Sequence, residues 1–175
     1  MANRSKKVVL SARVEPYLKA ALELYATSTN EKIVKVLERF IETCLSDAQI
    51  ENPLNGYKKG YFMTIFTAIW SEDEVIFNLR AGLMGSKFSS DRLFHLAMTV
   101  VGDHRFKGDF DLFGDLNGMA ERFEFVQPYE AKIDLGLVRS EWDVLVAYVD
   151  FLENNKPFCP TYDDYKRMRE QSESK

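Results

Sequence analysis

The residues with the most informative chemistry are the cations near the N-terminus. Residues 1–45 contain eight Lys and Arg against five Glu, a net charge of +3, whereas residues 46–175 contain 15 cations and 22 acids, a net charge of −7. The whole chain has a net charge of −4, which argues against a protein that coats nucleic acid indiscriminately. A cationic segment ahead of an acidic remainder predicts that the first 45 residues meet an anionic partner.

The residue types that support catalysis are scarce. His95 and His104 are the only histidines, and neither has the spacing to a nucleophile that a hydrolytic triad would show. The chain has no glycine-rich phosphate loop, and its carboxylates are too numerous to single out a catalytic pair. We therefore expect that the protein is not an enzyme and that it uses no cofactor.

Metal binding is also not indicated. The segment 109–117 resembles a calcium loop because acids stand at its first and third positions, but Phe113 and Ala120 occupy positions that require oxygen ligands. Cys44 and Cys159 lack the spacing of a metal site, so buried, reduced thiols are predicted. We expect no metal site.

The composition is that of one or two folded domains. The chain has 175 residues, of which 46% are hydrophobic and 29% charged. No apolar run approaches the roughly 20 residues that span a bilayer, and no apolar signal-peptide segment follows the basic N-terminus. These features predict a cytoplasmic protein without a membrane partner.

The first 45 residues have the pattern of one strand and two helices. Residues 8–14 alternate, with Val9, Ser11 and Arg13 on one face and apolar residues on the other. A helix is expected from Pro16 to Ala26. A second helix is expected to reach about Leu45, after a capping box of Ser28 and Glu31 or an N-cap at Thr29. Its inward residues are predicted to be Ile33, Val36, Leu37, Phe40, Ile41 and Cys44.

A strand and two helices in about 40 residues cannot cover their own apolar faces, because such short chains seldom bury a sufficient core. No disulfide or metal is indicated that would compensate. Two copies can solve the problem if their strands pair antiparallel and their four helices close over the ribbon. The outward faces of two such strands form a ribbon that fits the DNA major groove.

Residues 6–45, KKVVLSARVEPYLKAALELYATSTNEKIVKVLERFIETCL, resemble a ribbon-helix-helix DNA-binding domain of the Arc/CopG/MetJ type. The resemblance lies in the basic arm, the alternating strand that ends in Arg13, the Glu-Pro helix start and the polar turn. It covers about a quarter of the chain. Two features differ from the family: Thr27 or Ser28 stands where glycine is usual, and Val9 is apolar where many members carry a polar residue.

The resemblance implies a homodimer that binds double-stranded DNA sequence-specifically. Three residues would read base edges, and Arg13 could donate two hydrogen bonds to a guanine. Other residues would contact phosphates through side chains or through the backbone amides that open the second helix. The implied base-reading residues are Val9, Ser11 and Arg13, and the implied phosphate-contacting residues are Arg4, Lys6, Lys7, Ser28, Thr29 and Asn30.

The sequence therefore predicts an α+β chain with an N-terminal ribbon-helix-helix unit, an intertwined dimer, and a C-terminal α+β domain with mostly antiparallel strands. The expected segments are a DNA-binding and dimerisation domain over 1–46, a linker over 47–59, an α+β domain over 60–165 and a charged, frayed tail over 166–175. The second domain is expected to serve oligomerisation, or to bind an effector or another protein.

Several elements of the second domain are predicted from local patterns. A hairpin is expected over residues 61–81, with a helix starting at Ser71 as the alternative, since SEDE also forms a capping box. A capped helix is expected after Ser89-Ser90-Asp91, ending near Gly102, and a second one is expected from a cap at Ser140 to about residues 154–155. Strands are expected over 123–126 and 131–137.

Three functions are consistent with these features. The first is a homodimeric or higher-order transcriptional regulator, a repressor, encoded by a genome, plasmid or phage. The second is a protein-interaction or assembly factor in which the N-terminal unit only dimerises. The third is a DNA-binding accessory protein of plasmid maintenance or conjugation.

Overall fold

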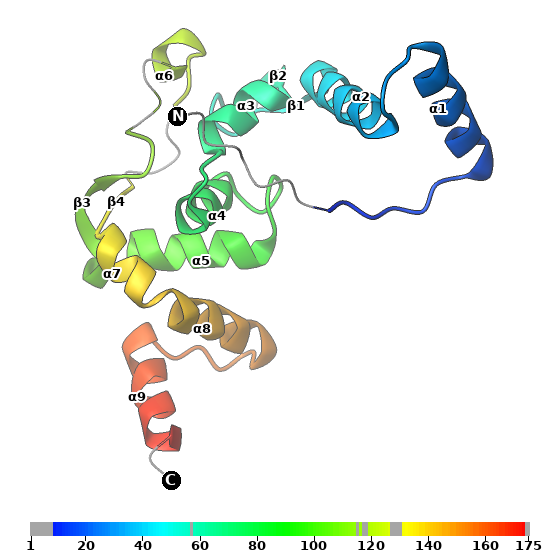
Figure 1. The fold of residues 1–175 in the computed structure, drawn as a ribbon. Helices are drawn as coiled ribbons and strands as arrows, with labels where there is room; N and C mark the ends of the chain where they lie inside the picture. Colours follow the sequence, from blue (N-terminus) through cyan, green and yellow to red (C-terminus); the bar gives the residue numbers. More distant parts are fainter. Residues whose placement is uncertain (1–8, 57, 115, 117–118, 127–130, 174–175) are drawn as a thin grey trace. The chain divides into compact units, whose positions relative to one another are not determined.

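The structure is a computed structural model that describes residues 9–56, 58–114, 116, 119–126 and 131–173. The chain divides between Asp47 and Ala48 into two compact units, and each is described by itself (Figure 1). Helices are combined, in the described residues, with two small antiparallel sheets of two strands each, which confirms the expected α+β class. No helix within those ranges has the length and apolar composition to cross a membrane.

The first unit contains the two expected helices, α1 (Pro16–Ser28) and α2 (Ile33–Asp47). Glu15 precedes α1 in an extended conformation, and Pro16 is its first residue, where a missing N–H costs nothing. The expected strand over 8–14 is not formed by its described residues, because residues 9–15 have no regular secondary structure. A strand needs a hydrogen-bonded partner, and a single chain supplies none at this place.

The second unit begins with a hairpin where a linker was expected. Strand β1 (Gln49–Glu51) pairs antiparallel with β2 (Lys59–Tyr61). Asn52 turns the chain between them, since its side-chain oxygen accepts from the Leu54 amide at 2.9 Å, and Leu54 is buried. In place of the linker expected over 47–59, residue 47 ends α2 and the residues after it form the hairpin. The polar residues there form the hydrogen bonds of a compact turn.

The hairpin expected over 61–81 was wrong as well, because two helices, α3 (Phe62–Ile69) and α4 (Glu74–Leu83), occupy this region. Phe62, Phe66 and Trp70 follow one another at four-residue spacing, and their rings stack with centroids 5.9 and 5.6 Å apart. Asp73 caps α4, because its side chain accepts from the amides of Val75 and Ile76 at 2.9 and 3.1 Å. The capping alternative was thus nearer to the structure, with Asp73 in place of Ser71.

Helix α5 (Asp91–Gly102) packs against α4, and the two lie side by side in Figure 1. The predicted cap is confirmed, since the Ser90 hydroxyl accepts from the Leu93 amide at 3.2 Å. The helices approach closely at Gly82, where an added Cβ would overlap the carbonyl oxygen of Leu93. A side chain is excluded at this position by backbone rather than by a movable neighbour.

The remaining elements complete the second unit. Strands β3 (Lys107–Asp111) and β4 (Lys132–Ile133) pair antiparallel. The strand predicted over 131–137 was wrong beyond Ile133, because Asp134 caps a helix by accepting from the Leu137 amide at 2.9 Å; residues 123–126 form no strand. These elements are η1 (His104–Phe106), β3 (Lys107–Asp111), α6 (Met119–Arg122), β4 (Lys132–Ile133), α7 (Leu135–Ser140), α8 (Trp142–Asn154) and α9 (Tyr162–Glu173).

Among the described residues, Arg80 is a cation buried in the core of the second unit, where it is 2% exposed. Its Nε donates to the carbonyl oxygen of Leu112 at 2.6 Å and its Nη1 to that of Trp70 at 3.2 Å. Its guanidinium also lies 5.8 Å from the centroid of the Phe113 ring. Arg80 thereby joins α4 to the end of α3 and to the chain after β3.

Two further expectations were wrong. The segment 166–173, expected to fray, belongs to α9, which Lys166 joins to Glu141 at 2.7 Å. Cys44 and Cys159, expected to be buried, are both exposed and free. Cys44 lies on the apolar side of α2, which the first unit leaves open, as described next.

Candidate nucleic-acid interface

The segment ahead of α1 is open to solvent. Val9, Ser11 and Arg13, the predicted base-reading residues, are all exposed, Val9 by 93%. Within the residues that the structure describes, the Arg13 guanidinium has no ion pair or hydrogen bond. The side chain is thus available for an external acceptor. Arg4, Lys6 and Lys7, the predicted phosphate contacts of the arm, lie outside the described residues.

The two helices contact each other over a small area. Ala26 and Val36 are the buried residues of α1 and α2, and the Tyr25 and Phe40 rings meet with centroids 5.3 Å apart. We call the apolar face that remains open on α2 the α2 stripe. Its members share one side of the helix and are each at least 38% exposed: Ile33, Val34, Leu37, Phe40, Ile41 and Leu45.

Apolar side chains are also exposed outside α2. Exposed apolar side chains continue through the segment ahead of α1 and along α1 itself. They are Val9, Leu10, Val14, Tyr17, Leu18, Leu24 and Tyr25. The first unit therefore leaves apolar side chains exposed on α1, on α2 and on the segment ahead of α1.

The turn between α1 and α2 differs from the prediction. Ser28 is the last residue of α1, and the left-handed residue is Asn30, with φ of +53°. The amides of Asn30 and Glu31 donate to the carbonyls of Thr27 and Ala26 at 3.2 and 2.9 Å, a Schellman motif. Asn30 takes the place of glycine here because asparagine tolerates the left-handed region. The prediction that Thr27 or Ser28 stands at the usual glycine position was therefore wrong, since Asn30 occupies it.

This turn also changes the predicted phosphate contacts. The amides of Thr29 and Asn30 donate to carbonyls of α1, and the hydroxyls of Ser28 and Thr29 donate to Tyr25 at 2.8 and 3.0 Å. These groups satisfy the end of α1 and do not open α2. The helix begins at Ile33, and its first amides lack intrahelical acceptors as in any helix. The open amides of this region therefore lie at the Ile33 end of α2, beside Lys32.

Charges on the two helices are partly neutralised. Arg39 pairs with Glu31 at 2.8 Å and its guanidinium lies 5.9 Å from the Tyr25 ring centroid. Lys19 pairs with Glu23 at 3.4 Å. In the described part of the chain, Lys32 and Lys35 of the same unit have no such partner. The cations open to a phosphate therefore lie near the start of α2.

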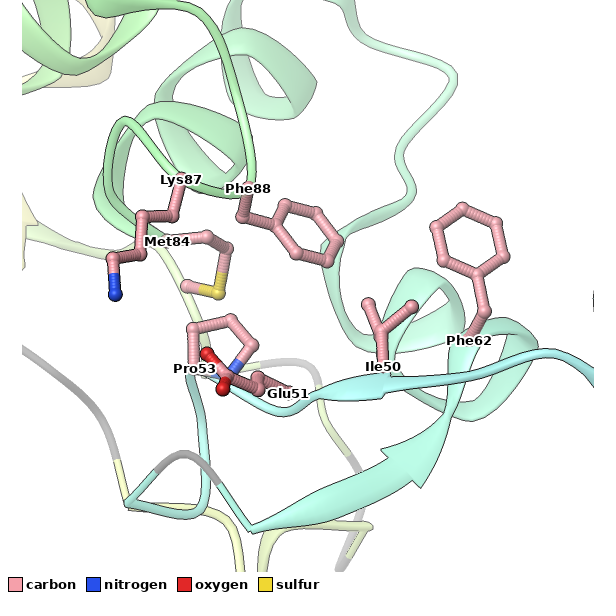
Figure 2. A pocket seen from close by; sticks show the side chains of 7 residues that line it. All are labelled: Ile50, Glu51, Pro53, Phe62, Met84, Lys87 and Phe88. Carbon is pink, nitrogen blue, oxygen red and sulfur yellow. The ribbon is translucent and has the colours of Figure 1, made fainter.

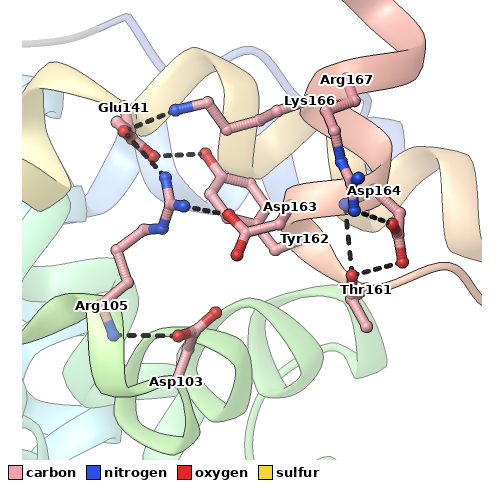
Figure 3. A network of polar contacts seen from close by, with 9 residues as sticks. All are labelled: Asp103, Arg105, Glu141, Thr161, Tyr162, Asp163, Asp164, Lys166 and Arg167. Carbon is pink, nitrogen blue, oxygen red and sulfur yellow. Dashed lines mark hydrogen bonds and ion pairs between the residues drawn. The ribbon is translucent and has the colours of Figure 1, made fainter.

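A network of polar contacts in the second unit holds α9 (Figure 3). Glu141 accepts from the Tyr162 hydroxyl at 2.9 Å and from the Lys166 ammonium at 2.7 Å, and Arg105 lies 3.7 Å from the same carboxylate. Arg105 is also paired with Asp163. The Glu141 carboxylate thus accepts from two residues of α9 and lies near the Arg105 guanidinium, so the cluster joins α9 to the start of α8 and to η1.

This cluster shifts two pKa values. Burial by itself raises the pKa of Glu141, but the hydrogen bonds from Lys166 and Tyr162 and the nearby positive charges outweigh it, so that the pKa lies below its usual value. Burial and the hydrogen bond to Glu141 raise the pKa of Tyr162. At neutral pH the first group is ionised and the second is a neutral donor.

Glu141→Gln is expected to lower the free energy of unfolding by about 2 kcal/mol at pH 7, the scale of a hydrogen bond to a charged group. Because the folded state lowers the pKa of Glu141, the unfolded state binds more protons, and the carboxylate stabilises the fold above its unfolded pKa of about 4.3. That contribution disappears as pH falls through the folded pKa. The difference between variant and wild type should therefore narrow towards pH 3 in urea unfolding.

The control for this measurement is Glu124→Gln, which alters an exposed carboxylate and should change stability little at either pH. A deficit of Glu141→Gln that is the same at pH 7 and pH 3 would contradict the assignment of the ionised, donor-bound carboxylate.

No group of His, Cys, Asp and Glu side chains in the described residues could hold a metal ion. Comparisons of the chain with family models, with curated proteins and with solved structures gave no match.

Proposed function

We propose that the protein is a homodimeric, sequence-specific DNA-binding regulator, a repressor, of the ribbon-helix-helix type. In the dimer, residues 8–14 of two copies pair antiparallel, and the helices of both copies cover the ribbon. The face with Val9, Ser11 and Arg13 enters the major groove. The second unit, which carries the acidic excess of the chain, stays away from the duplex.

The observation that carries this proposal is the open α2 stripe. Leu37, Phe40 and Ile41 lie on one face of α2, and each is more than 38% exposed. Their exposure to water would destabilise the unit as a monomer. Burial of each such side chain contributes about 1.5–3 kcal/mol. A second copy provides a complementary apolar surface because a two-fold interface is built from the same patch on both sides.

The N-terminal segment supports the DNA contact independently. Arg13 is exposed and unpaired among the described residues, and its planar guanidinium can donate two hydrogen bonds to guanine. Ser11, on the same face of an extended chain, can donate or accept. The net charge of +3 over residues 1–45 attracts the phosphate backbone.

Arg13→Ala is expected to reduce discrimination between cognate and random DNA by about 1–3 kcal/mol, the contribution of a bidentate base contact. Lys6→Ala should weaken binding to all sequences alike and reduce the salt slope by about one. The cognate duplex comes from selection of genomic fragments on the full-length protein, followed by salt-titrated mobility shifts. Lys58→Ala, in the second unit, is the control. Equal losses on both duplexes for Arg13→Ala would remove this residue from the base-reading set.

The second candidate function is a protein-interaction or assembly factor in which the first unit only dimerises. The pairing of Arg39 with Glu31 and of Lys19 with Glu23 favours it, because these cations are partly neutralised. The same mobility shift separates the two. Retention that modest salt abolishes, with no preferred sequence, would favour the assembly factor.

A further inference from the structure

An apolar pocket of about 470 Å³ lies in the second unit. It is formed by β1 and the turn after it, by the start of α3 and by the connection between α4 and α5 (Figure 2). Ile50, Phe62, Met84 and Phe88 supply its walls, and their side chains point toward a common space. The volume lies within the range of about 300–1,000 Å³ that is typical of small-molecule sites.

The walls favour a flat apolar group. The Phe62 and Phe88 rings are nearly parallel, at 22°, with centroids 6.3 Å apart, and both residues line the space. Met84 adds a thioether, which contacts aromatic rings favourably. An aromatic side chain offers the largest apolar contact in such surroundings.

The pocket also carries two opposite charges that do not neutralise each other. Lys87 and Glu51 line it from different segments, and both are exposed. Within the described ranges, neither side chain takes part in an ion pair or a hydrogen bond. Figure 2 shows the Lys87 ammonium and the Glu51 carboxylate on the side of Pro53, with Phe62 at the opposite side.

We propose that this pocket binds the zwitterion of an apolar α-amino acid, preferably an aromatic one. The ligand carboxylate lies at Lys87, the ligand ammonium lies at Glu51, and the side chain extends between Phe88 and Ile50 toward Phe62. A ligand with one charge alone would make only one of these two ionic contacts and leave the other side chain in water. The pocket would therefore select molecules that carry both charges at one end.

The test compares three probes that share a phenyl ring and a two-carbon chain. They are L-phenylalanine, 3-phenylpropionate, which lacks the amine, and 2-phenylethylamine, which lacks the carboxylate. Titrations of the full-length protein by calorimetry and ligand-observed NMR should show L-phenylalanine binding about ten-fold or more tightly than either analogue, the scale of one lost charge-assisted contact.

Variants place the binding in the pocket. Lys87→Met should weaken L-phenylalanine about ten-fold and leave 2-phenylethylamine unchanged, whereas Glu51→Gln should leave 3-phenylpropionate unweakened. Phe88→Ala should weaken all three probes. Lys132→Met is the control, because it removes an exposed lysine of β4 that does not line the pocket. Both charged side chains are exposed, so their variants should fold even if Phe88→Ala does not.

Equal affinity for the three probes, or no L-phenylalanine binding at about 10 mM, would overturn the proposal. So would unchanged affinity of Lys87→Met for L-phenylalanine. None of these measurements depends on DNA, so failure of the proposed regulator function and failure of this site can be told apart.

Discussion

Leu37→Asp is expected to convert the protein into a monomer and to abolish specific DNA binding. Leu37 lies in the middle of the α2 stripe and is 42% exposed in one chain. In a symmetric dimer the change removes two leucine contacts, each worth about 1.5–3 kcal/mol, and adds the cost of placing carboxylates in an apolar interface. The dimer dissociation constant should rise by at least about 10²–10⁴-fold. Sedimentation velocity measures the mass, and mobility shifts measure the loss of DNA binding.

Ser46→Asp is the matched control, because it introduces the same charge on the polar side of the same helix, where Ser46 is exposed. It should stay dimeric. If Leu37→Asp sediments as wild type does and keeps its DNA affinity, the α2 stripe does not form the interface.

Gly82→Ala is expected to destabilise the second unit by about 3 kcal/mol or more. The new methyl group would overlap the carbonyl oxygen of Leu93 and come within 2.7 Å of the Ala97 Cβ. Relief requires α4 and α5 to separate along the core that they share, and overpacking against backbone has a cost at the upper end of the range for core substitutions. Urea unfolding measures the loss. Both tryptophans, Trp70 and Trp142, lie in the second unit, so their fluorescence reports on that unit.

Gly102→Ala provides the control. It makes the same chemical change at the end of α5, where an added Cβ meets nothing within 4 Å. Stability should stay the same or rise by up to about 1 kcal/mol, because alanine favours the helix. Equal effects of the two substitutions would show that close packing at Gly82 does not matter.

Helices with regular apolar spacing and a clear cap could be predicted from the sequence. The start of α1 at Pro16, a cap of α5 within residues 89–91 and the end of α8 near Asn154 are confirmed. The cap expected at Ser140 was wrong, because Ser140 is the last residue of α7 and its hydroxyl donates to the Leu137 carbonyl. In each confirmed case local residues determine the boundary: a proline or hydroxyl satisfies the first turn, and the repeat of three and four residues defines a buried face.

The predictions failed where local composition and tertiary packing disagree. Residues 62–69 are rich in aromatic and β-branched side chains, which favour strands, but rings at four-residue spacing stack along α3. The polar residues around Asn52 indicated a linker, and their role in a turn depends on the pairing of β1 with β2. As a result, Ile50 and Glu51 could not be recognised as pocket residues, since the expected linker contained both.

The candidate interface was only partly predictable. The alternation that places Arg13 beside Ser11 is visible in the sequence, but the contact residues at the turn depend on where α1 ends. Asn30 belongs to the Schellman motif that ends α1, and α2 therefore begins only at Ile33. Asn30 was the residue in the sequence that could have indicated this helix end, because asparagine can replace glycine in a Schellman motif.

The most direct test of the account is amide hydrogen exchange of the full-length protein over residues 9–15. These residues form no strand within one chain, so protection there can come only from pairing with another copy or from another partner. We predict slow exchange in the purified wild type and rapid exchange in Leu37→Asp. Exchange at the rate of an unstructured peptide in the wild type, at concentrations well above any dimer dissociation constant, would contradict the account.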